Sequence, residues 1–158
     1  MTNTDSQTEY FNLPIKGLGY LNRFREVKAS NGRRYGYHAV EVCAMEGPTN
    51  RPNYTRFDAI ISGAEALEVL KGLKTEILDK KTKVLAGFNL GGVTPNIYTV
   101  KQGDKAGEQR VSLKSRLLRI GWVKVKGPND QAYETVYTAP APEEDVTQEQ
   151  ENQGATAS

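Results

Sequence analysis

The sequence has very little of the two residue types that most often build metal sites and covalent catalysis. Among its 158 residues, Cys43 is the only cysteine and His38 the only histidine. A single cysteine excludes an internal disulfide framework and is typical of a reducing compartment. One Cys and one His cannot form a usual zinc site, and His38 alternates with Val40 and Val42, which favours a structural role. We therefore expect no cofactor, no metal and no enzymatic activity.

Long apolar runs are also missing. No stretch approaches the roughly 20 residues that a membrane helix needs. The first ten residues, MTNTDSQTEY, have neither the basic nor the apolar region of a secretory signal. The glycine-rich pieces Gly17-x-Gly19 and Gly91-Gly92 lack the Lys-Ser/Thr of a phosphate-binding loop. These absences predict a cytoplasmic protein without a nucleotide-binding loop.

Positive charge is absent from the end of the chain. All 21 Lys and Arg lie between Lys16 and Lys126, where the first 126 residues hold 12 Asp and Glu. The last 32 residues hold seven carboxylates and no base. The small net charge of +2 therefore combines a basic part of +9 with an acidic end of −7. This asymmetry favours a folded part that meets a polyanion.

The hydrophobic pattern predicts a chain of strands interrupted by one helix. Apolar residues alternate with a period of two in most segments, but the period changes to about 3.6 after Gly63. We expect strands at about 15–27, 35–45, 54–62, 83–90, 96–102 and 109–126, a helix at about 64–79, and a short edge strand at 133–137. Ser30-Asn31-Gly32 and the 103–107 loop read as hairpin turns.

Three strands, a helix and then two or three more strands predict a mainly β, five-stranded OB-fold barrel, with the helix between strands 3 and 4. Such barrels bind oligonucleotides with one face and its loops. A different small α+β sheet domain is the second possibility. We expect a flexible N-terminal arm at 1–11, the OB-fold nucleic-acid-binding domain at 12–137 and a disordered acidic tail at 138–158.

Several motifs resemble those of bacterial single-stranded DNA-binding (SSB) proteins. They are Gly19-x-Leu21, Glu26-Val27, Asn31-Gly32, Ser62-Gly63-x-x-Ala66 and Val84-x-x-Gly87-x-x-Leu90. The sequence is also similar, over about 11–127, to a replication-protein family carried by integrating conjugative elements and genomic islands. That likeness rests on Gly17-x-Gly19-Tyr20-Leu21-Asn22-Arg23, Tyr54-Thr55-Arg56-Phe57-Asp58 and Val111-Ser112-Leu113-Lys114-x-Arg116-Leu117-Leu118.

These resemblances imply a protein that coats single-stranded DNA during replication or transfer of a mobile genetic element. They also imply a homo-oligomer, with a tetramer favoured over a dimer, and contacts with replication or conjugation proteins. Two positions depart from the SSB pattern. Arg56 stands near a position where SSB proteins have a Trp, and the acidic tail ends in Gly-Ala-Thr-Ala-Ser without an apolar tip.

Single-stranded nucleic acid needs cations for its phosphates and flat rings for its bases. Phe57 shares a face with Ala59 and Ile61, so we expect it in the core, whereas Tyr54 lies opposite and is the better stacking platform. Trp122 is expected in the core or at a subunit interface. The predicted binding residues are Arg23, Arg25, Arg33, Arg34, Tyr35, Tyr37, Tyr54, Arg56, Tyr98, Lys105, Lys114 and Arg116. A protein-interaction module of a replication or conjugation complex is the alternative.

Overall fold

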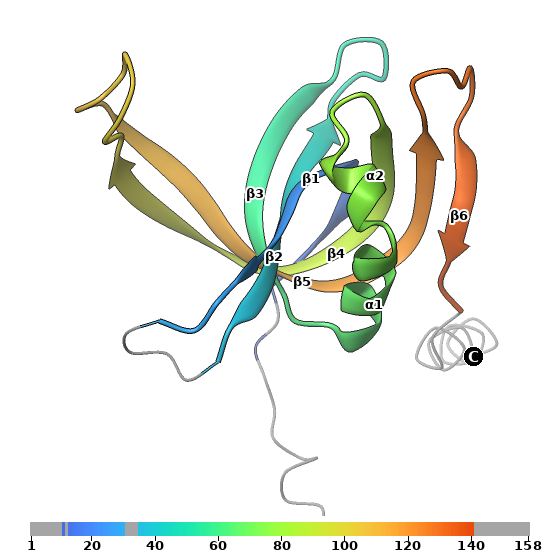
Figure 1. The fold of residues 1–158 in the computed structure, drawn as a ribbon, viewed down its shortest axis with the longest axis horizontal. Coiled ribbons are helices and arrows are strands. Elements are labelled where there is room, and N and C mark those ends of the chain that lie inside the picture. Colours follow the sequence, from blue (N-terminus) through green and yellow to red (C-terminus); the bar gives the residue numbers. More distant parts are fainter. Residues whose placement is uncertain (1–10, 12, 31–34, 141–158) are drawn as a thin grey trace, which may run out of the picture.

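The computed structural model describes residue 11, residues 13–30 and residues 35–140. Six strands and two short helices follow one another in the order β1–β2–β3–α1–α2–β4–β5–β6 (Figure 1). Their bounds are β1 Pro14–Val27, β2 Tyr37–Glu46, β3 Asn53–Ile61, α1 Ala64–Gly72, α2 Lys74–Leu78, β4 Lys83–Thr99, β5 Gln109–Lys126 and β6 Glu134–Thr138.

Five of the strands form a closed barrel. The sheet order is β3-β2-β1-β4-β5, and β3 pairs back onto β5, from Phe57 beside Leu113 to Ile61 beside Leu117. That last pairing is parallel, whereas the other neighbours in the barrel are antiparallel. The helices lie between β3 and β4 in the chain. This is the OB-fold arrangement, so the predicted fold class is confirmed.

The barrel is filled by the inward-facing residues of every strand. Leu21, Val42, Ala59, Leu90 and Leu117 are among the side chains with at most 1% exposure. The helices add Ala66, Leu70 and Ile77 to the same cluster, so they cover part of the barrel rather than standing apart. Phe57 is buried as predicted, and Cys43 is buried too. His38 stacks on Phe24 with 5.7 Å between ring centroids, which is the structural role expected for it.

Irregular positions let long strands bend around the barrel. In β1, the pairing with β2 shifts between Asn22 and Arg25, and Arg23 there has a φ of 52°. In β5, the register skips Leu118, at the place where two adjacent leucines predict a bulge. Each bulge gives the strand an extra residue, which sharpens its bend and redirects the side chains that follow. Because of the first bulge, Phe24 points inward and Arg25 lies opposite Ala39.

Two predicted boundaries are wrong. Gly91-Gly92 does not end a strand; β4 continues to Thr99 and absorbs the separate strand predicted at 96–102. Gly92 has a φ of 71°, so the glycines serve as an irregularity within one strand rather than as a break. The predicted 64–79 helix is split into two at Leu73. The other strand limits, including that of β6, agree with prediction to within one or two residues.

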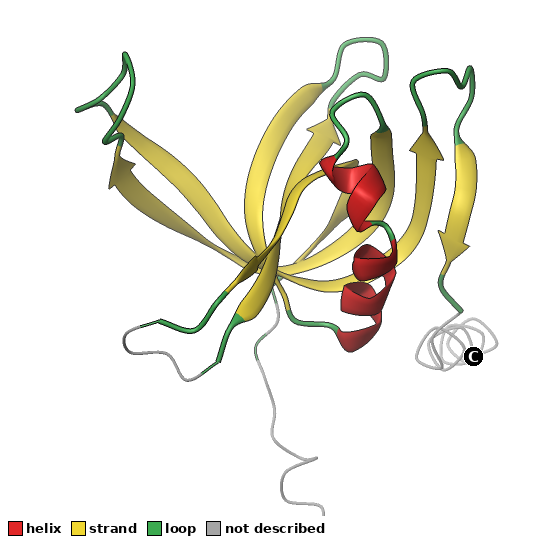
Figure 2. Cartoon of the chain, in the orientation of Figure 1, coloured by secondary structure: helices red, strands yellow, loops and turns green. Residues whose placement is uncertain are grey.

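The ends of β4 and β5 extend beyond the barrel as a two-stranded ribbon, which we call the arm (residues 96–112). Its strands pair from Asn96 beside Ser112 to Thr99 beside Gln109. Figure 2 shows the arm projecting from the body on the side opposite the helices. The β1–β2 hairpin leaves the barrel on the same side as the arm. The barrel surface between them is thus flanked by two hairpins.

The tight crossing of β1 and β2 predicts a strong effect of adding one methyl group. A Cβ on Gly19 would lie 2.2 Å from the Cys43 carbonyl oxygen, which is fixed backbone. We expect Gly19→Ala to lower the free energy of unfolding by about 2 kcal/mol. Gly72→Ala is the control, because a Cβ there meets nothing within 4 Å. Denaturant titrations would contradict this packing if both variants matched the wild type.

Candidate nucleic-acid interface

The outward-facing residues of β1, β2, β3 and β5 form one continuous surface, which we call the outer face. The strand register aligns these residues in rows across the sheet. One row runs from Asn22 through Glu41 and Asp58 to Lys114. The neighbouring rows consist of Arg25, Ala39, Ile60 and Arg116, and of Tyr20, Cys43 and Arg56. The barrel therefore brings together cations that lie far apart in the sequence.

Asp58 is the electrostatic centre of the outer face. Its carboxylate accepts hydrogen bonds from the Arg25 guanidinium at 2.8 Å and from the Lys114 ammonium at 2.6 Å. Partial burial alone raises the pKa of Asp58, but the hydrogen bonds from Lys114 and Arg25 outweigh it and hold the pKa below its usual value. The two cations are thus fixed in place, with their charge only partly neutralised, since two positive groups share one carboxylate.

Arg56 and Tyr54 extend the outer face along β3. Both are exposed, and Tyr54 retains 53% of its surface. Among the described residues, Arg56 makes no ion pair, whereas Arg23 lies 3.7 Å from Glu41. Tyr54 is the cross-strand partner of the apolar Met45. This combination suits a stacking platform beside a free cation.

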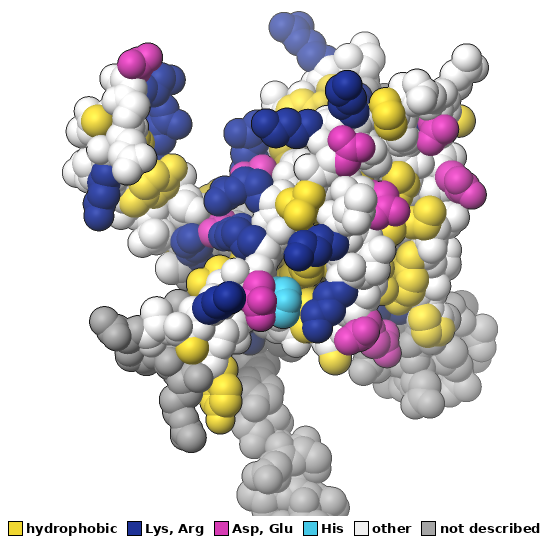
Figure 3. Space-filling view, viewed as in Figure 1, with side chains coloured by type: hydrophobic (Ala, Val, Ile, Leu, Met, Phe, Trp, Pro, Cys, Tyr) yellow, Lys and Arg dark blue, Asp and Glu magenta, His cyan; other side chains and the backbone are white. Residues whose placement is uncertain are grey.

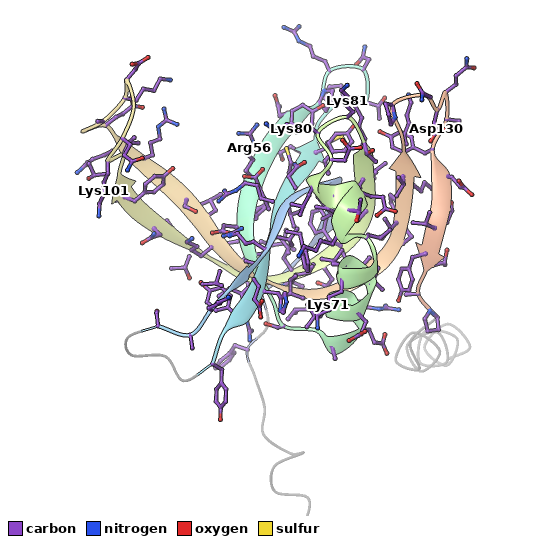
Figure 4. All side chains as sticks on the ribbon, in the orientation of Figure 1. Arg56, Lys71, Lys80, Lys81, Lys101 and Asp130 are labelled. Atoms are coloured by element: carbon purple, nitrogen blue, oxygen red, sulfur yellow. The ribbon has the colours of Figure 1, made fainter. Side chains whose placement is uncertain are left out.

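The same face continues onto the arm. Tyr98 lies on the same side as Lys114, because Arg110 and Ser112 precede Lys114 at alternate positions of β5 and Arg110 pairs with Tyr98. Lys105 lies in the exposed loop at the arm's tip, near Lys101, which Figure 4 labels. Figure 3 shows Lys and Arg gathered on the body next to the arm. The basic surface is therefore continuous from barrel to arm.

The remaining predicted residues are less centrally placed. Arg33 and Arg34 lie outside the described residues. Tyr35 is 73% exposed, and Tyr37 is half-buried opposite Val27. Arg116 stands at the margin of the outer face, where it lines a hollow together with Leu118 and the N-terminal residues Phe11 and Leu13. Trp122 is half-buried and packs over Gly87, outside the barrel core.

A second group of basic and aromatic residues surrounds the predicted Tyr54, and its other members were missed by sequence reasoning. Tyr20 and Tyr54 line a hollow together with Lys80 and Lys83, and Tyr133 interacts with both tyrosines. These residues come from four separate segments of the sequence, and no local pattern connects them. The one available signal was the Lys80-Lys81-Thr82-Lys83 run, which reads as the basic end of a helix.

Two features, a metal-binding cluster and a membrane-spanning helix, are absent from the described part of the chain. Within it, no group of three or more His, Cys, Asp or Glu side chains is placed to hold a metal ion. The helices described there are too short and too polar to cross a bilayer. The outer face presents cations and exposed aromatic rings.

Comparison with known proteins identifies one family and one distant fold likeness. A family model described as "Protein of unknown function (DUF3577)" matches residues 4–144. No curated protein matches the chain. Among solved structures, it is similar to the mitochondrial single-stranded DNA-binding protein Rim1 of S. cerevisiae, with 14% identity and a TM-score of 0.34. That match covers 72% of this chain and 94% of Rim1. A likeness this distant leaves function to be inferred from the residues themselves.

The Asp58 cluster predicts a pH-dependent contribution to stability. Because the pKa of Asp58 is lowered in the folded state, its contribution is present above the unfolded value of roughly 3.9 and is lost as the pH falls through the lower folded value. We expect Asp58→Asn to lower the free energy of unfolding by about 1–2 kcal/mol at pH 7, since Arg25 and Lys114 keep some access to solvent.

This difference between wild type and Asp58→Asn should shrink when unfolding is measured below about pH 3.9. Asp104→Asn, a change in the exposed loop of the arm, is the matched control and should alter stability little at any pH. A difference that stayed constant from neutral to strongly acidic pH would show that Asp58 contributes through packing instead of charge.

Proposed function

The chain belongs to the DUF3577 family, and we propose that it binds single-stranded DNA, with little sequence preference, along the outer face and the arm. The observation that carries this proposal is that cations from separate strands gather beside an exposed tyrosine on one face of the barrel. Arg56 and Lys114 lie on this face with Tyr54, and Arg110 continues it onto the arm next to Tyr98.

The chemistry of the outer face favours a single strand over a duplex. In a duplex the flat faces of the bases are stacked on one another, so exposed rings such as Tyr54 and Tyr98 have nothing to stack on. A single strand offers both its phosphates and its bases, and each stacked base contributes about 1–3 kcal/mol. Stacking and phosphate contacts are tolerant of sequence, because every base has a flat face and every nucleotide a phosphate.

The biological setting and assembly remain predictions from the sequence resemblance. They are coating of DNA during replication or transfer of a mobile genetic element, a homo-oligomer with a tetramer favoured over a dimer, and a cytoplasmic location. The protein's role is binding rather than catalysis. Replication or conjugation proteins are the expected protein partners.

A protein-interaction module is the second candidate function, and one feature of the arm favours it. The side of the arm opposite Tyr98 carries Ile97 and Val111, which pair across the strands and are 68% and 60% exposed. Two adjacent β-branched side chains on an isolated ribbon suit a protein contact better than a nucleic acid. Both functions can coexist, since the two sides of the arm differ in chemistry.

Binding of a fluorescent oligo-dT, measured by anisotropy at several salt concentrations, tests the proposed function. We expect tight binding at low salt, and much weaker binding of a duplex of equal length. The slope of log K against log salt is negative, and Arg56→Ala should make it less steep by about 0.7, the value for one phosphate contact on a single strand. Lys71→Ala removes one exposed charge from α1 and should leave the slope unchanged.

Two outcomes would reject single-stranded DNA as the ligand. One is absence of binding at low salt, and the other is binding no tighter than that of the duplex. A protein partner retained by pull-down after Arg56 and Arg116 are neutralised would favour the interaction module in its place.

A further inference from the structure

Three tyrosines form a cluster: Tyr20 of β1, Tyr54 of β3 and Tyr133, the residue just before β6. Tyr20 and Tyr54 both line a hollow of about 250 Å³. Burial, followed by a hydrogen bond with Tyr20 and the nearby Tyr54, raises the pKa of Tyr133 to about 12. The hollow is smaller than the roughly 300–1,000 Å³ of most small-molecule pockets, and it is open to the surface. It suits a single flat group presented from solvent rather than an enclosed ligand.

Lysines surround these tyrosines. Lys80 and Lys83 line the hollow itself, and the Lys126 ammonium lies 5.7 Å from the centre of the Tyr133 ring. Lys83 and Lys126 are also direct cross-strand partners in β4 and β5. Like charges in that arrangement repel one another. Within the part of the chain that the structure describes, none of these three lysines makes an ion pair. The cluster therefore carries positive charge that an anion would relieve.

The two turns that present these lysines are held by their own aspartates. After α2, the Asp79 carboxylate accepts hydrogen bonds from the Lys81 backbone N–H at 3.1 Å and from the Thr82 hydroxyl at 2.7 Å. After β5, the Asp130 carboxylate accepts one from the Gly127 N–H at 2.8 Å. Both carboxylates satisfy backbone or hydroxyl donors in their own turns. They shape the loops and leave the lysines available.

The cluster adjoins the outer face. Tyr54 is two residues from Arg56 on the same face of β3, and Arg56 is aligned through Cys43 with Tyr20. Figure 4 labels Arg56, Lys80 and Lys81 on the upper part of the molecule, whereas Lys71 of α1 lies well apart from them. A nucleic-acid strand that leaves Arg56 past Tyr54 thus reaches the tyrosines and lysines of the cluster next.

We propose that Tyr20, Tyr133, Lys80, Lys83 and Lys126 form a second nucleotide-binding segment, onto which the single strand continues from the outer face. A base enters the hollow against the tyrosines, and the phosphates on either side contact the lysines. Tyr133 directly precedes β6, the strand that lies outside the five-stranded barrel. The inference rests on the proposed function, because it extends the path of the same ligand.

Salt-dependent binding of oligo-dT of about 16 nucleotides tests this segment. We expect the double substitution Lys80→Ala with Lys83→Ala to make the negative slope of log K against log salt less steep by about 1.4, the value for two phosphate contacts. The matched control is Lys71→Ala with Lys74→Ala, which removes two exposed charges from the helices and should leave the slope unchanged.

A second pair of variants tests the stacking ring. Tyr133→Leu should weaken binding about fivefold or more, whereas Tyr133→Phe keeps the ring and should bind nearly as the wild type does. Thermal unfolding of each variant checks that the fold, including β6, is retained. If Tyr133→Leu does not fold, the comparison between the two double lysine variants tests the second segment instead.

The outcomes separate this inference from the proposed function. If the wild type binds oligo-dT and the Lys80/Lys83 variant has the same salt dependence as its control, the proposed second segment is wrong. The proposed binding on the outer face is then unaffected. If wild type fails to bind oligo-dT at low salt, both are wrong.

Discussion

The parallel pairing of β3 with β5 is the constraint on which the rest of the molecule depends. It joins residues 57–61 to residues 113–117 and converts a curved sheet into a closed barrel. The same contact places Asp58 beside Lys114, and the backbone N–H groups of Ser62 and Gly63 donate to the Leu117 carbonyl at 2.9 and 3.2 Å. Barrel closure, the central ion pairs and the start of α1 therefore depend on one short ladder.

Closure also explains why the protein keeps carboxylates on a basic surface. Asp58 lies between two cations, and its negative charge fixes them at the cost of part of their attraction for phosphate. Arg56 and the lysines around Tyr133 have no such partner among the described residues. The outer face thus combines two kinds of cation. Some are held rigidly and partly neutralised, and others are free to meet a moving polyanion.

Much of the fold could be predicted from local pattern. Alternating apolar residues located the strands, because each strand has one face in the core, and the adjacent leucines at 117–118 located a bulge. The continuity of β4 could not be predicted, because Gly91-Gly92 reads equally as a break or as an irregularity until its pairing with β5 is known. The division of the helix at Leu73 similarly depends on tertiary packing rather than on period.

Only those residues of the candidate site that lie together on one strand could be predicted from the sequence. Tyr54 and Arg56 follow from the alternation of β3, since Phe57 must point inward. The role of Asp58 needs the β3–β5 register, which joins residues 56 positions apart in the chain. The tyrosine–lysine cluster draws on β1, β3, β4, β5, the turn after α2 and the residue before β6, so no sequence window contains it. Long-range pairing, which sequence pattern does not specify, accounts for each of these omissions.

The most direct test of single-strand binding on the outer face is a map of backbone amide chemical shifts during titration with oligo-dT. If the strand lies where we place it, the shifts will change along β3, at residues 113–116 of β5 and on the arm, and they will stay constant in α1. Changes centred on the helices, or no changes at saturating DNA and low salt, would contradict the account.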